Sequence, residues 1–470
     1  MPTRRQILCT GAAAAAAVSA GAATTAPLLA AVPELRIQSA RYALQGETAT
    51  EGLVSLAPDA PPPVLRMRQG MAFETDVTNT LPDYTAMHWH GIRVPNAMDG
   101  VPYLTQIPIG QGERYRYAFT PEDAGTYWYH PHCMTMDQMG RGLTGLLVVE
   151  EAEDPGFDTE IALNLRDFRL GRDGALLDAQ WSARGAARAG THGALMTANW
   201  QTAPLYTAPA GGLVRLRLAA TDPTRIYRLY LEPVEGQNTP VEGRVIALDG
   251  HPVREAPPWP TPKAPLPLSP GQRADIALKM PAEEGREVLL ITDRPGKPRL
   301  LARLRAEGAD RGRALAEIKP LAPNPLSEPD LASARVEEFV FGWTPEKSLA
   351  NNGVCGTLGY TFWSINRIPY PGDAATGAGP LATLRLGQSY VLRLRNESPN
   401  AHPIHLHGLT FRPLRSNQRA ITSNWTDTAL LLSGETLDVA LVADNPGDWA
   451  FHCHIIEHQK TGLAGFIRVA

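Results

Sequence analysis

Histidines in this chain are gathered into four short clusters, and this pattern limits the folds that can bring them together. Ten of the twelve histidines lie in His88-Trp89-His90, His130-Pro131-His132, His402-Pro403-Ile404-His405-Leu406-His407, and His452-Cys453-His454 followed by His458. Each cluster contains a His-x-His pair, which twelve histidines scattered over 470 residues would rarely produce by chance. Neutral imidazole is the commonest metal ligand, and one thiolate among imidazoles favours copper, zinc or iron over hard cations. The clusters therefore predict a metal site.

Length and composition indicate a multidomain β protein. The chain of 470 residues is long enough for two to four domains, each with its own core. Proline and glycine, 42 of each, favour many short strands joined by turns over long helices. A formal net charge of −4 provides no basic surface for nucleic acid, so we expect no nucleic-acid partner.

The N-terminus has the features of an export signal. Arg4 and Arg5 precede an alanine-rich, mildly apolar stretch, so we assign residues 1–31 to a signal peptide. Adjacent arginines resemble a twin-arginine signal, which exports folded proteins in bacteria, and they predict a periplasmic or otherwise exported protein. A Sec signal or a retained anchor is the alternative. No later window approaches about 18 uninterrupted apolar residues, so we expect no stable membrane insertion of the mature chain.

The first and last thirds of the chain repeat one another around the histidines. In each third an asparagine precedes a His-x-His-Gly sequence by nine residues, and a glycine precedes a second His-x-His pair by five. These residues are Asn79, His88, Gly125 and His130 in the first copy, and Asn396, His405, Gly447 and His452 in the second. Two copies of one supersecondary plan indicate duplicated domains.

The segment between the two copies has room for a third domain. Alternating runs such as residues 213–218 and 274–278 predict strands of a sandwich or barrel, without clustered metal ligands. Charged residues 172–188 are predicted to form a solvated loop rather than a site. The expected domains are residues 32–152, 153–306 and 333–470, with the charged, proline-containing residues 307–332 as a linker.

Strand geometry sorts the ligands into two sites, because residues two apart point to one face of a strand and neighbours point to opposite faces. His452 and His454 then face one way and Cys453 the other, while His402 points away from His405. The first site gathers His402, Cys453 and His458, a two-imidazole, one-thiolate set that matches the trigonal ligation of blue copper. The second site gathers the four His-x-His pairs.

Eight imidazoles are too many for one ion, which takes about four to six ligands, so a cluster of about three metals fits the second site. Half of its ligands come from the first domain and half from the last, so we expect it at their interface. Cys453 lies covalently between His452 and His454 and gives a short bonded route from the single metal to the cluster. Both domains lie in one chain, so a monomer suffices.

This order of motifs is similar to that of the three-domain multicopper oxidases. The resemblance covers essentially all of the mature chain and includes residues 138–143 and 247–250. It implies an all-β chain of three cupredoxin-like Greek-key sandwich or barrel domains with four copper ions, one type 1, one type 2 and two type 3. By this resemblance His402, Cys453 and His458 hold the type 1 copper, His88 and His405 the type 2 copper, and His90, His130, His132, His407, His452 and His454 the type 3 pair.

The resemblance also assigns three further positions. Family members carry Met, Leu or Phe ten residues after the cysteine; here it is Leu463, which cannot donate to copper and predicts a moderate to high type 1 potential. Asp99 matches the acid near the type 2 copper and is the expected catalytic proton donor, although Met98-Asp99-Gly100 is also a good turn. Bacterial relatives often have a second acid directly after the last type 1 histidine, where this chain has Gln459.

Three features stay open at the level of sequence. Cys133 and Cys355 can pair in an exported protein only if their Cα atoms lie within about 7 Å. The sulfur-rich residues 133–139, with Met134, Met136 and Met139, suit packing at a domain interface, which we favour, or an accessory Cu(I) site. Asp427 either orients an imidazole ring or belongs to a surface turn.

The metal sites predict an oxidase that takes single electrons from a reductant at the type 1 site and reduces dioxygen to water at the cluster. Phenols or aromatic amines are the expected reductants, as in laccases, and the metal ions Cu(I), Mn(II) or Fe(II) are the alternative. A copper-free cell-division or assembly protein of the same fold is the alternative outside the enzymes. Retention of the complete ligand set argues against it.

Overall fold

The computed structural model describes residues 30–31, 34–236, 240–293, 297–343, 355, 361–370 and 379–470. The predicted signal peptide lies outside the described residues, except for Ala30 and Ala31, which form the short strand β1. In the described part, strands dominate, and the α-helices are α1 (Thr135–Gly140), α2 (Ala183–Ala186) and α3 (Ile456–Lys460). No helix among these residues is long and apolar enough to cross a membrane. The predicted all-β, cupredoxin-like class is confirmed.

Two sheets enclose the core of the first domain. One has the order β1-β5-β2-β3 with β7 beside β5, and the other has the order β4-β9-β8-β6. Their apolar residues, including Ile37, Val77 and Trp89, form one buried cluster. The strands are β1 (Ala30–Ala31), β2 (Leu35–Tyr42), β3 (Thr50–Ser55), β4 (Leu65–Arg68), β5 (Phe73–Asn79), β6 (Met87–His90), β7 (Arg114–Phe119), β8 (Gly125–Pro131) and β9 (Gly145–Glu150), with the 3-10 helix η1 (Asn96–Met98) after β6.

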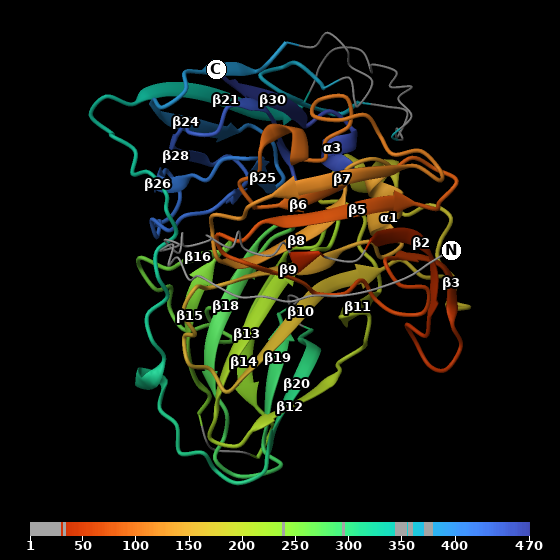
Figure 1. The fold of residues 1–470 in the computed structure, drawn as a ribbon, viewed down its shortest axis with the longest axis vertical. Coiled ribbons are helices and arrows are strands. Elements are labelled where there is room, and N and C mark those ends of the chain that lie inside the picture. Colours follow the sequence, from red (N-terminus) through yellow and green to blue (C-terminus); the bar gives the residue numbers. More distant parts are fainter. Residues whose placement is uncertain are drawn as a thin grey trace, which may run out of the picture.

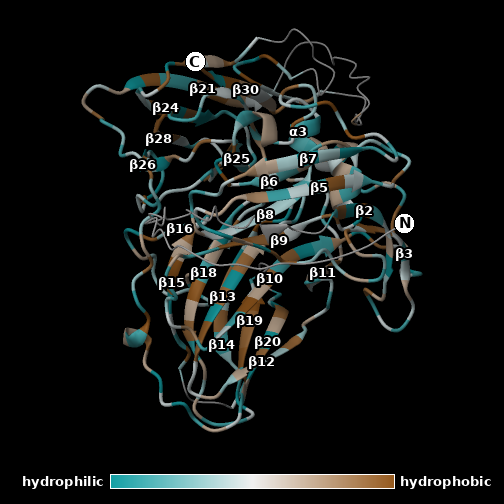
Figure 2. Cartoon of the chain, in the orientation of Figure 1, coloured by the Kyte–Doolittle hydropathy of each residue, from teal (hydrophilic) through white to brown (hydrophobic). Residues whose placement is uncertain are grey.

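The middle domain repeats this plan with longer sheets. Their orders are β11-β10-β13-β18-β15-β16 and β12-β20-β19-β14-β17. Figure 2 shows apolar segments on these strands and more polar residues on many of the loops around them. The strands are β10 (Thr159–Phe168), β11 (Leu195–Ala198), β12 (Leu205–Pro209), β13 (Leu213–Ala220), β14 (Tyr227–Pro233), β15 (Glu242–Leu248), β16 (His251–Pro252), β17 (Leu266–Leu268), β18 (Arg273–Lys279), β19 (Glu287–Thr292) and β20 (Arg299–Glu307).

The last domain contains sheets of order β22-β21-β24-β28-β26 and β23-β30-β29-β25-β27. Figure 1 shows it beside the first domain at one end of the molecule, with the middle domain at the other end. Its strands are β21 (Arg335–Trp343), β22 (Trp363–Ile365), β23 (Ala382–Leu384), β24 (Ser389–Asn396), β25 (His402–Leu406), β26 (Arg412–Ser416), β27 (Thr428–Leu431), β28 (Thr436–Val442), β29 (Gly447–Cys453) and β30 (Ala464–Val469).

Two parallel strand pairings recur in every domain. The pairs β2 with β5, β10 with β13, and β21 with β24 are parallel. So are β4 with β9, β12 with β20, and β23 with β30. Antiparallel pairs make up most of the remaining ladders. The middle segment is therefore a third copy of the plan that the sequence repeats in its first and last thirds.

The repeated asparagines and glycines of the sequence have matching structural roles. In both copies, Asn79 and Asn396 donate their side-chain amide to two backbone carbonyls, one of them four residues ahead, and accept a bond from the amide two residues ahead. Gly125 and Gly447 begin β8 and β29 with positive φ angles of 149° and 142°. A Cβ at Gly125 would lie 2.1 Å from the carbonyl oxygen of Gly250 in the middle domain, so close approach also requires glycine there.

The predicted linker contains the 3-10 helix η2 (Leu315–Glu317) and runs along the middle domain to the last one (Figure 1). Asn324 fastens it to both preceding domains. Its side chain accepts a bond from the Ala124 amide at 2.9 Å and donates to the Ala124 carbonyl at 2.9 Å and the Gly250 carbonyl at 3.2 Å. The same amide nitrogen lies 2.9 Å from His251 Nδ1, so this histidine outside the clusters belongs to the interdomain packing.

A disulfide joins Cys133, which follows the second histidine pair, to Cys355, which precedes the last domain's β22. Their Cα atoms are 4.5 Å apart and their positions are 222 residues apart in sequence. The pairing that the sequence left open is thus present. It also removes Cys133 as a free thiolate, which argues against an accessory Cu(I) site in residues 133–139.

We expect the double substitution Cys133→Ser/Cys355→Ser to lower the free energy of unfolding by about 2–4 kcal/mol, because the cross-link restricts the unfolded chain. Thermal unfolding of the copper-free protein, with and without a thiol reductant, measures the effect. The reductant should lower the melting temperature of the wild type but leave that of the double variant unchanged. Equal melting temperatures of the two oxidised proteins would contradict this role.

Candidate metal centres

Four strands place the four His-x-His pairs between the first and last domains, while His458 lies in α3. His88 and His90 lie in β6, which pairs with β8 so that His88 lies opposite His130. In the last domain His405 of β25 lies opposite His452 of β29. The second histidine of three of the pairs follows its strand directly. All predicted ligand side chains are buried, at most 3% exposed.

His402, Cys453 and His458 form one compact group. The two Nδ1 atoms are 3.1 Å apart, and Cys453 Sγ lies 3.6 Å from each of them. The outer Nε2 of His402 is 2.8 Å from Ser398 Oγ, and that of His458 is 2.6 Å from the carbonyl oxygen of Arg188. These outer contacts leave both Nδ1 lone pairs facing the sulfur, as a two-imidazole, one-thiolate copper site requires.

Leu463 is attached to this group through its backbone. Its amide donates to the His458 carbonyl at 2.9 Å, and its carbonyl accepts from the Cys453 amide at 3.0 Å. Its side chain is fully buried in the same apolar cluster as Cys453. The amide of Ile455 donates to Cys453 Sγ at 3.4 Å. Leu463 therefore lies next to this group in surroundings that exclude water, and its assignment to the axial position stays a prediction.

The four His-x-His pairs form three further groups whose ligand atoms lie within 4.8 Å of one another. These groups are His88, His90 and His405; His90, His130 and His454; and His132, His407 and His452. The second and third contain all six predicted type 3 ligands, three for each ion. The first contains both predicted type 2 ligands. Each group combines residues of the first and last domains.

Backbone carbonyls fix the tautomers of several rings. Nδ1 of His88, His130 and His405 lies 2.7, 2.9 and 2.9 Å from the carbonyl oxygens of Asp99, Pro131 and Asp427, respectively. A carbonyl only accepts, so Nδ1 carries the proton and Nε2 is left with its lone pair. Among the described residues, no hydrogen-bond partner meets the Nε2 atoms of these three rings. Buried nitrogen atoms in this state fit a metal cluster.

Burial also sets the protonation of the ligands. It lowers the pKa of His452 and of His458 to about 3, and it lowers the pKa of His90 and His130 well below the usual value. These rings are therefore neutral and able to bind a metal. Burial raises the pKa of the Cys453 thiol, so metal binding must displace its proton.

Asp99 lies against ligands from both domains. Its Oδ2 accepts from His407 Nδ1 at 2.9 Å, and its Oδ1 is 3.3 Å from His88 Nδ1. The His407 ring then presents Nε2 to His452 Nε2, 3.0 Å away. Asp99 is 1% exposed and directly follows η1, so its carboxylate is buried beside the cluster rather than displayed in a surface turn. Its role as proton donor stays a prediction.

Asp427 orients two ligands and is held by the middle domain. Its Oδ1 lies 3.2 Å from His90 Nε2 and 3.3 Å from His405 Nδ1. Arg273, the first residue of β18, donates to both carboxylate oxygens at 2.9 and 2.6 Å. A Cβ at Gly91, whose φ is 88°, would lie 2.3 Å from the Arg273 guanidinium. Asp427 is 1% exposed, so its assignment to a surface turn is excluded.

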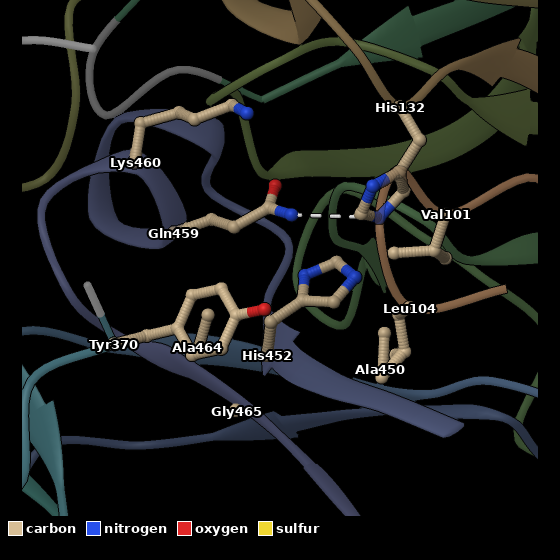
Figure 3. Close-up of a pocket in the computed structure, with 10 residues that line it drawn as sticks. All are labelled: Val101, Leu104, His132, Tyr370, Ala450, His452, Gln459, Lys460, Ala464 and Gly465. Carbon is tan, nitrogen blue, oxygen red and sulfur yellow. Dashed lines mark hydrogen bonds between the residues drawn. The ribbon is translucent and has the colours of Figure 1, made fainter. Parts of the chain in front are cut away.

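A small pocket reaches the cluster from the side of Gln459 (Figure 3). His132 and His452 line it, together with Tyr370 and Lys460. Gln459 Nε2 lies 3.5 Å from His132 Nε2, and the figure shows this amide pointing at the ring. An amide cannot supply a proton as a carboxylic acid does. The second acid of many bacterial relatives thus has no counterpart at position 459.

The methionines near Cys133 pack between domains. Met136 and Met139 are buried in a cluster with Trp128 of the first domain and Ile456 of the last. This arrangement supports the interface interpretation of residues 133–139.

Sequence reasoning missed two contributions of the middle domain. Residues 172–188, predicted to be a solvated loop, include the Arg188 carbonyl that covers His458, so that prediction was incomplete. A backbone carbonyl leaves no signal in the sequence. Arg273 has a charged side chain, but only its contact with Asp427 distinguishes it from the other arginines of this domain.

The fold and the two sites define a blue copper protein in which a cysteine joins the single-metal group to an eight-imidazole cluster. Two family models described as multicopper oxidase match residues 37–154 and 355–470. The multicopper oxidase MmcO of Mycobacterium tuberculosis is 30% identical over 441 residues, which cover 86% of this chain and 80% of that protein. A crystal structure of a multi-copper oxidase from Pseudomonas thermotolerans has 40% identity and a TM-score of 0.81, covering 94% of this chain and 100% of that one.

The chain belongs to the multicopper oxidase family. This membership confirms the expected family and the expected enzyme class, an oxidase with dioxygen as acceptor. It also confirms the expected cofactor of four copper ions, one of type 1, one of type 2 and two of type 3. Family membership therefore argues against the alternative of a copper-free cell-division or assembly protein.

Asp99→Asn keeps an oxygen that accepts from His407 but removes the acid. We expect the reoxidation of the fully reduced enzyme by dioxygen to slow by about 10²-fold, since general acid catalysis supplies factors of this size. The blue absorption band should be unchanged. Stopped-flow recovery of this band measures the rate, and Asp448→Asn, at an ion pair on β29, is the control. A wild-type rate in Asp99→Asn would remove this residue from the proton path.

Leu463→Met should lower the type 1 reduction potential, because a thioether can donate to copper where leucine cannot. Redox titration of the blue band measures the shift. Leu392→Met, a buried exchange in β24 of the same domain, should leave the potential unchanged. Both substitutions conserve volume and should cost less than about 1.5 kcal/mol in stability. An unchanged potential in Leu463→Met would rule out the axial assignment.

Proposed function

We propose that this multicopper oxidase is laccase-like and takes single electrons from phenols or aromatic amines to reduce dioxygen to water. The observation that carries this choice of reductant is an aromatic surface beside the type 1 group. Trp363 packs on both type 1 histidines, and Trp343 stacks on Trp363 while 40% exposed. A partly exposed indole ring suits a planar aromatic donor, which can pack against it.

The roles of the chain's own residues follow from their contacts. Copper held by these ligands supplies one-electron redox chemistry and the place where dioxygen is reduced. Cys453 links the type 1 group covalently to His452 and His454 in the cluster. Ser398 and the Arg188 carbonyl hold the outer nitrogens of the type 1 rings. Reduction of dioxygen to water takes four protons, and Asp99 is placed to supply protons beside the cluster.

Oxidation of Cu(I), Mn(II) or Fe(II) is the second candidate. The covered edge of His458 prevents direct contact of a phenol with a type 1 ring, so this edge gives no support to the laccase-like choice. Relatives of both kinds occur. Laccase-1 of Botryotinia fuckeliana is 27% identical over 443 residues, and an iron transport multicopper oxidase of Candida albicans is 26% identical over 464 residues. These two sequence identities are too similar to favour one class of reductant over the other.

We also propose that the enzyme is exported, as a monomer, to the periplasm or beyond. The twin arginines Arg4 and Arg5 support a route for folded proteins, which suits an enzyme that binds its metal before export. The disulfide between Cys133 and Cys355 is compatible with an oxidising compartment.

Oxygen uptake at matched copper loading tests the choice of reductant. We expect faster turnover with 2,6-dimethoxyphenol than with Cu(I), Mn(II) or Fe(II), because the surface beside the type 1 group is aromatic. Cys453→Ser, which removes the thiolate, is the negative control and should lose both the blue band and oxygen uptake. Faster turnover with one of the metal ions would overturn the laccase-like assignment in favour of the metallo-oxidase.

A further inference from the structure

The type 1 group has no exposed ligand through which a reductant can deliver an electron. His402, Cys453 and His458 are each 0% exposed. The covering segment, residues 182–191 with α2, places the Arg188 carbonyl 2.6 Å from His458 Nε2. Its end is tied to α3, since the Thr191 amide donates to Glu457 Oε2 at 2.9 Å. An electron must therefore pass through surrounding protein atoms to reach the group.

Trp363 is the aromatic neighbour of both type 1 histidines. Its ring centroid lies 5.0 Å from that of His402 and 4.7 Å from that of His458. The indole is fully buried, and its Nε1 donates to the carbonyl of Ala186 in the covering segment at 2.7 Å. This bond fixes the orientation of the ring, so Trp363 contacts the two ligands in one defined arrangement.

Trp343 extends this contact to the surface. It ends β21, and the antiparallel register of β21 and β22 places it opposite Trp363. The two rings are stacked, with centroids 4.6 Å apart and planes 25° apart. Trp363 is fully buried, whereas Trp343 is 40% exposed. The pair forms a continuous π contact from the outside of the last domain to both type 1 histidines.

We infer that electrons enter the type 1 group through the Trp343–Trp363 pair and that Trp343 is the residue on which the reductant docks. The reductant loses one electron, which passes through the two indole rings to the type 1 group, and both indoles end unchanged. A phenol also releases its hydroxyl proton to water. For aromatic reductants the inference rests on the proposed function, but the path itself applies to any one-electron donor that contacts Trp343.

Trp343 packs against Trp363 and Phe362, with ring centroids 4.6 and 6.5 Å apart, and is still partly exposed. Burial of a large ring stabilises a fold, but Trp343 leaves 40% of its surface in water. Two stacked rings in contact provide direct electronic coupling between the surface and the rings of the type 1 group. The other polar contacts of the type 1 rings are hydrogen bonds to the Ser398 hydroxyl and to the backbone carbonyl of Arg188. Among these contacts, the stack is the one that presents an aromatic ring to a reductant at the surface.

Anaerobic reduction of the oxidised, copper-loaded enzyme by hexaammineruthenium(II) tests the path. This complex transfers one electron without exchanging its ligands, and as a cation it can lie on an indole face. We expect Trp343→Leu to slow bleaching of the blue band about tenfold, equivalent to ~1.4 kcal/mol of barrier. Trp343→Phe should restore part of the rate. Trp259→Leu, at a partly buried tryptophan of the middle domain, is the matched control and should keep the wild-type rate.

Two further measurements separate conduction from a structural effect. The blue band and the type 1 potential should be the same in Trp343→Leu and wild type, and a rate loss fully explained by a changed potential would overturn the proposal. In the copper-free proteins, acrylamide should quench less of the tryptophan fluorescence in Trp343→Leu than in wild type. Equal quenching would show that Trp343 is not accessible and would also overturn the proposal.

The main alternative is that the covering segment opens and exposes His458. In that case Glu457→Gln, which weakens the bond to Thr191, would speed reduction of the type 1 group by the ruthenium complex, and Trp343→Leu would leave this rate unchanged. These two results together would overturn the proposed path. The ruthenium complex is neither a phenol nor a metal-ion substrate. If phenol oxidation fails while the rate of reduction by the ruthenium complex still depends on Trp343, the proposed reductant is rejected and the path is kept. If phenol is oxidised but the reduction rate does not depend on Trp343, the path is rejected and the proposed reductant is kept.

Discussion

The structure depends on the burial of eight imidazoles between the first and last domains. A buried ring nitrogen without a partner costs free energy, and the Nε2 atoms of His88, His130 and His405 meet no partner among the described residues. A metal satisfies such lone pairs together, so copper binding and closure of the domain interface are thermodynamically coupled. The cofactor is thus part of what holds the two domains in register.

The middle domain shows how a copy of the fold without ligands still shapes both metal centres. Arg273 reaches from β18 to Asp427 and, through it, to His90 and His405. At the other centre the covering segment supplies the carbonyl that faces His458. The same strand plan therefore serves twice for binding metal and once for positioning the residues that bind it.

The sequence was sufficient to predict the fold class and to group the ligands. Each histidine carries its chemistry in its side chain, and the spacing within the His-x-His pairs follows the period of a strand. The alternation of side chains along a strand predicted that Cys453 points away from His452 and His454. The structure places Cys453 in a different group of metal ligands from these two histidines. Features that depend on the distance between residues far apart in the sequence could not be predicted. Predicting the disulfide required the distance of 4.5 Å between the two Cα atoms, and predicting the Trp343–Trp363 stack required the register of two strands. Residues 172–188 were misjudged because their contribution is a backbone carbonyl.

The order of the ligands along the chain has a consequence for assembly. The cluster draws on His88 near the beginning and His454 near the end, and the type 1 group is complete only at His458, twelve residues before the last residue. A growing chain can fold its first and middle domains while neither centre yet exists. Assembly of both metal centres therefore waits until the last domain has been made, and the four imidazoles of the first domain have no partners from that domain before then.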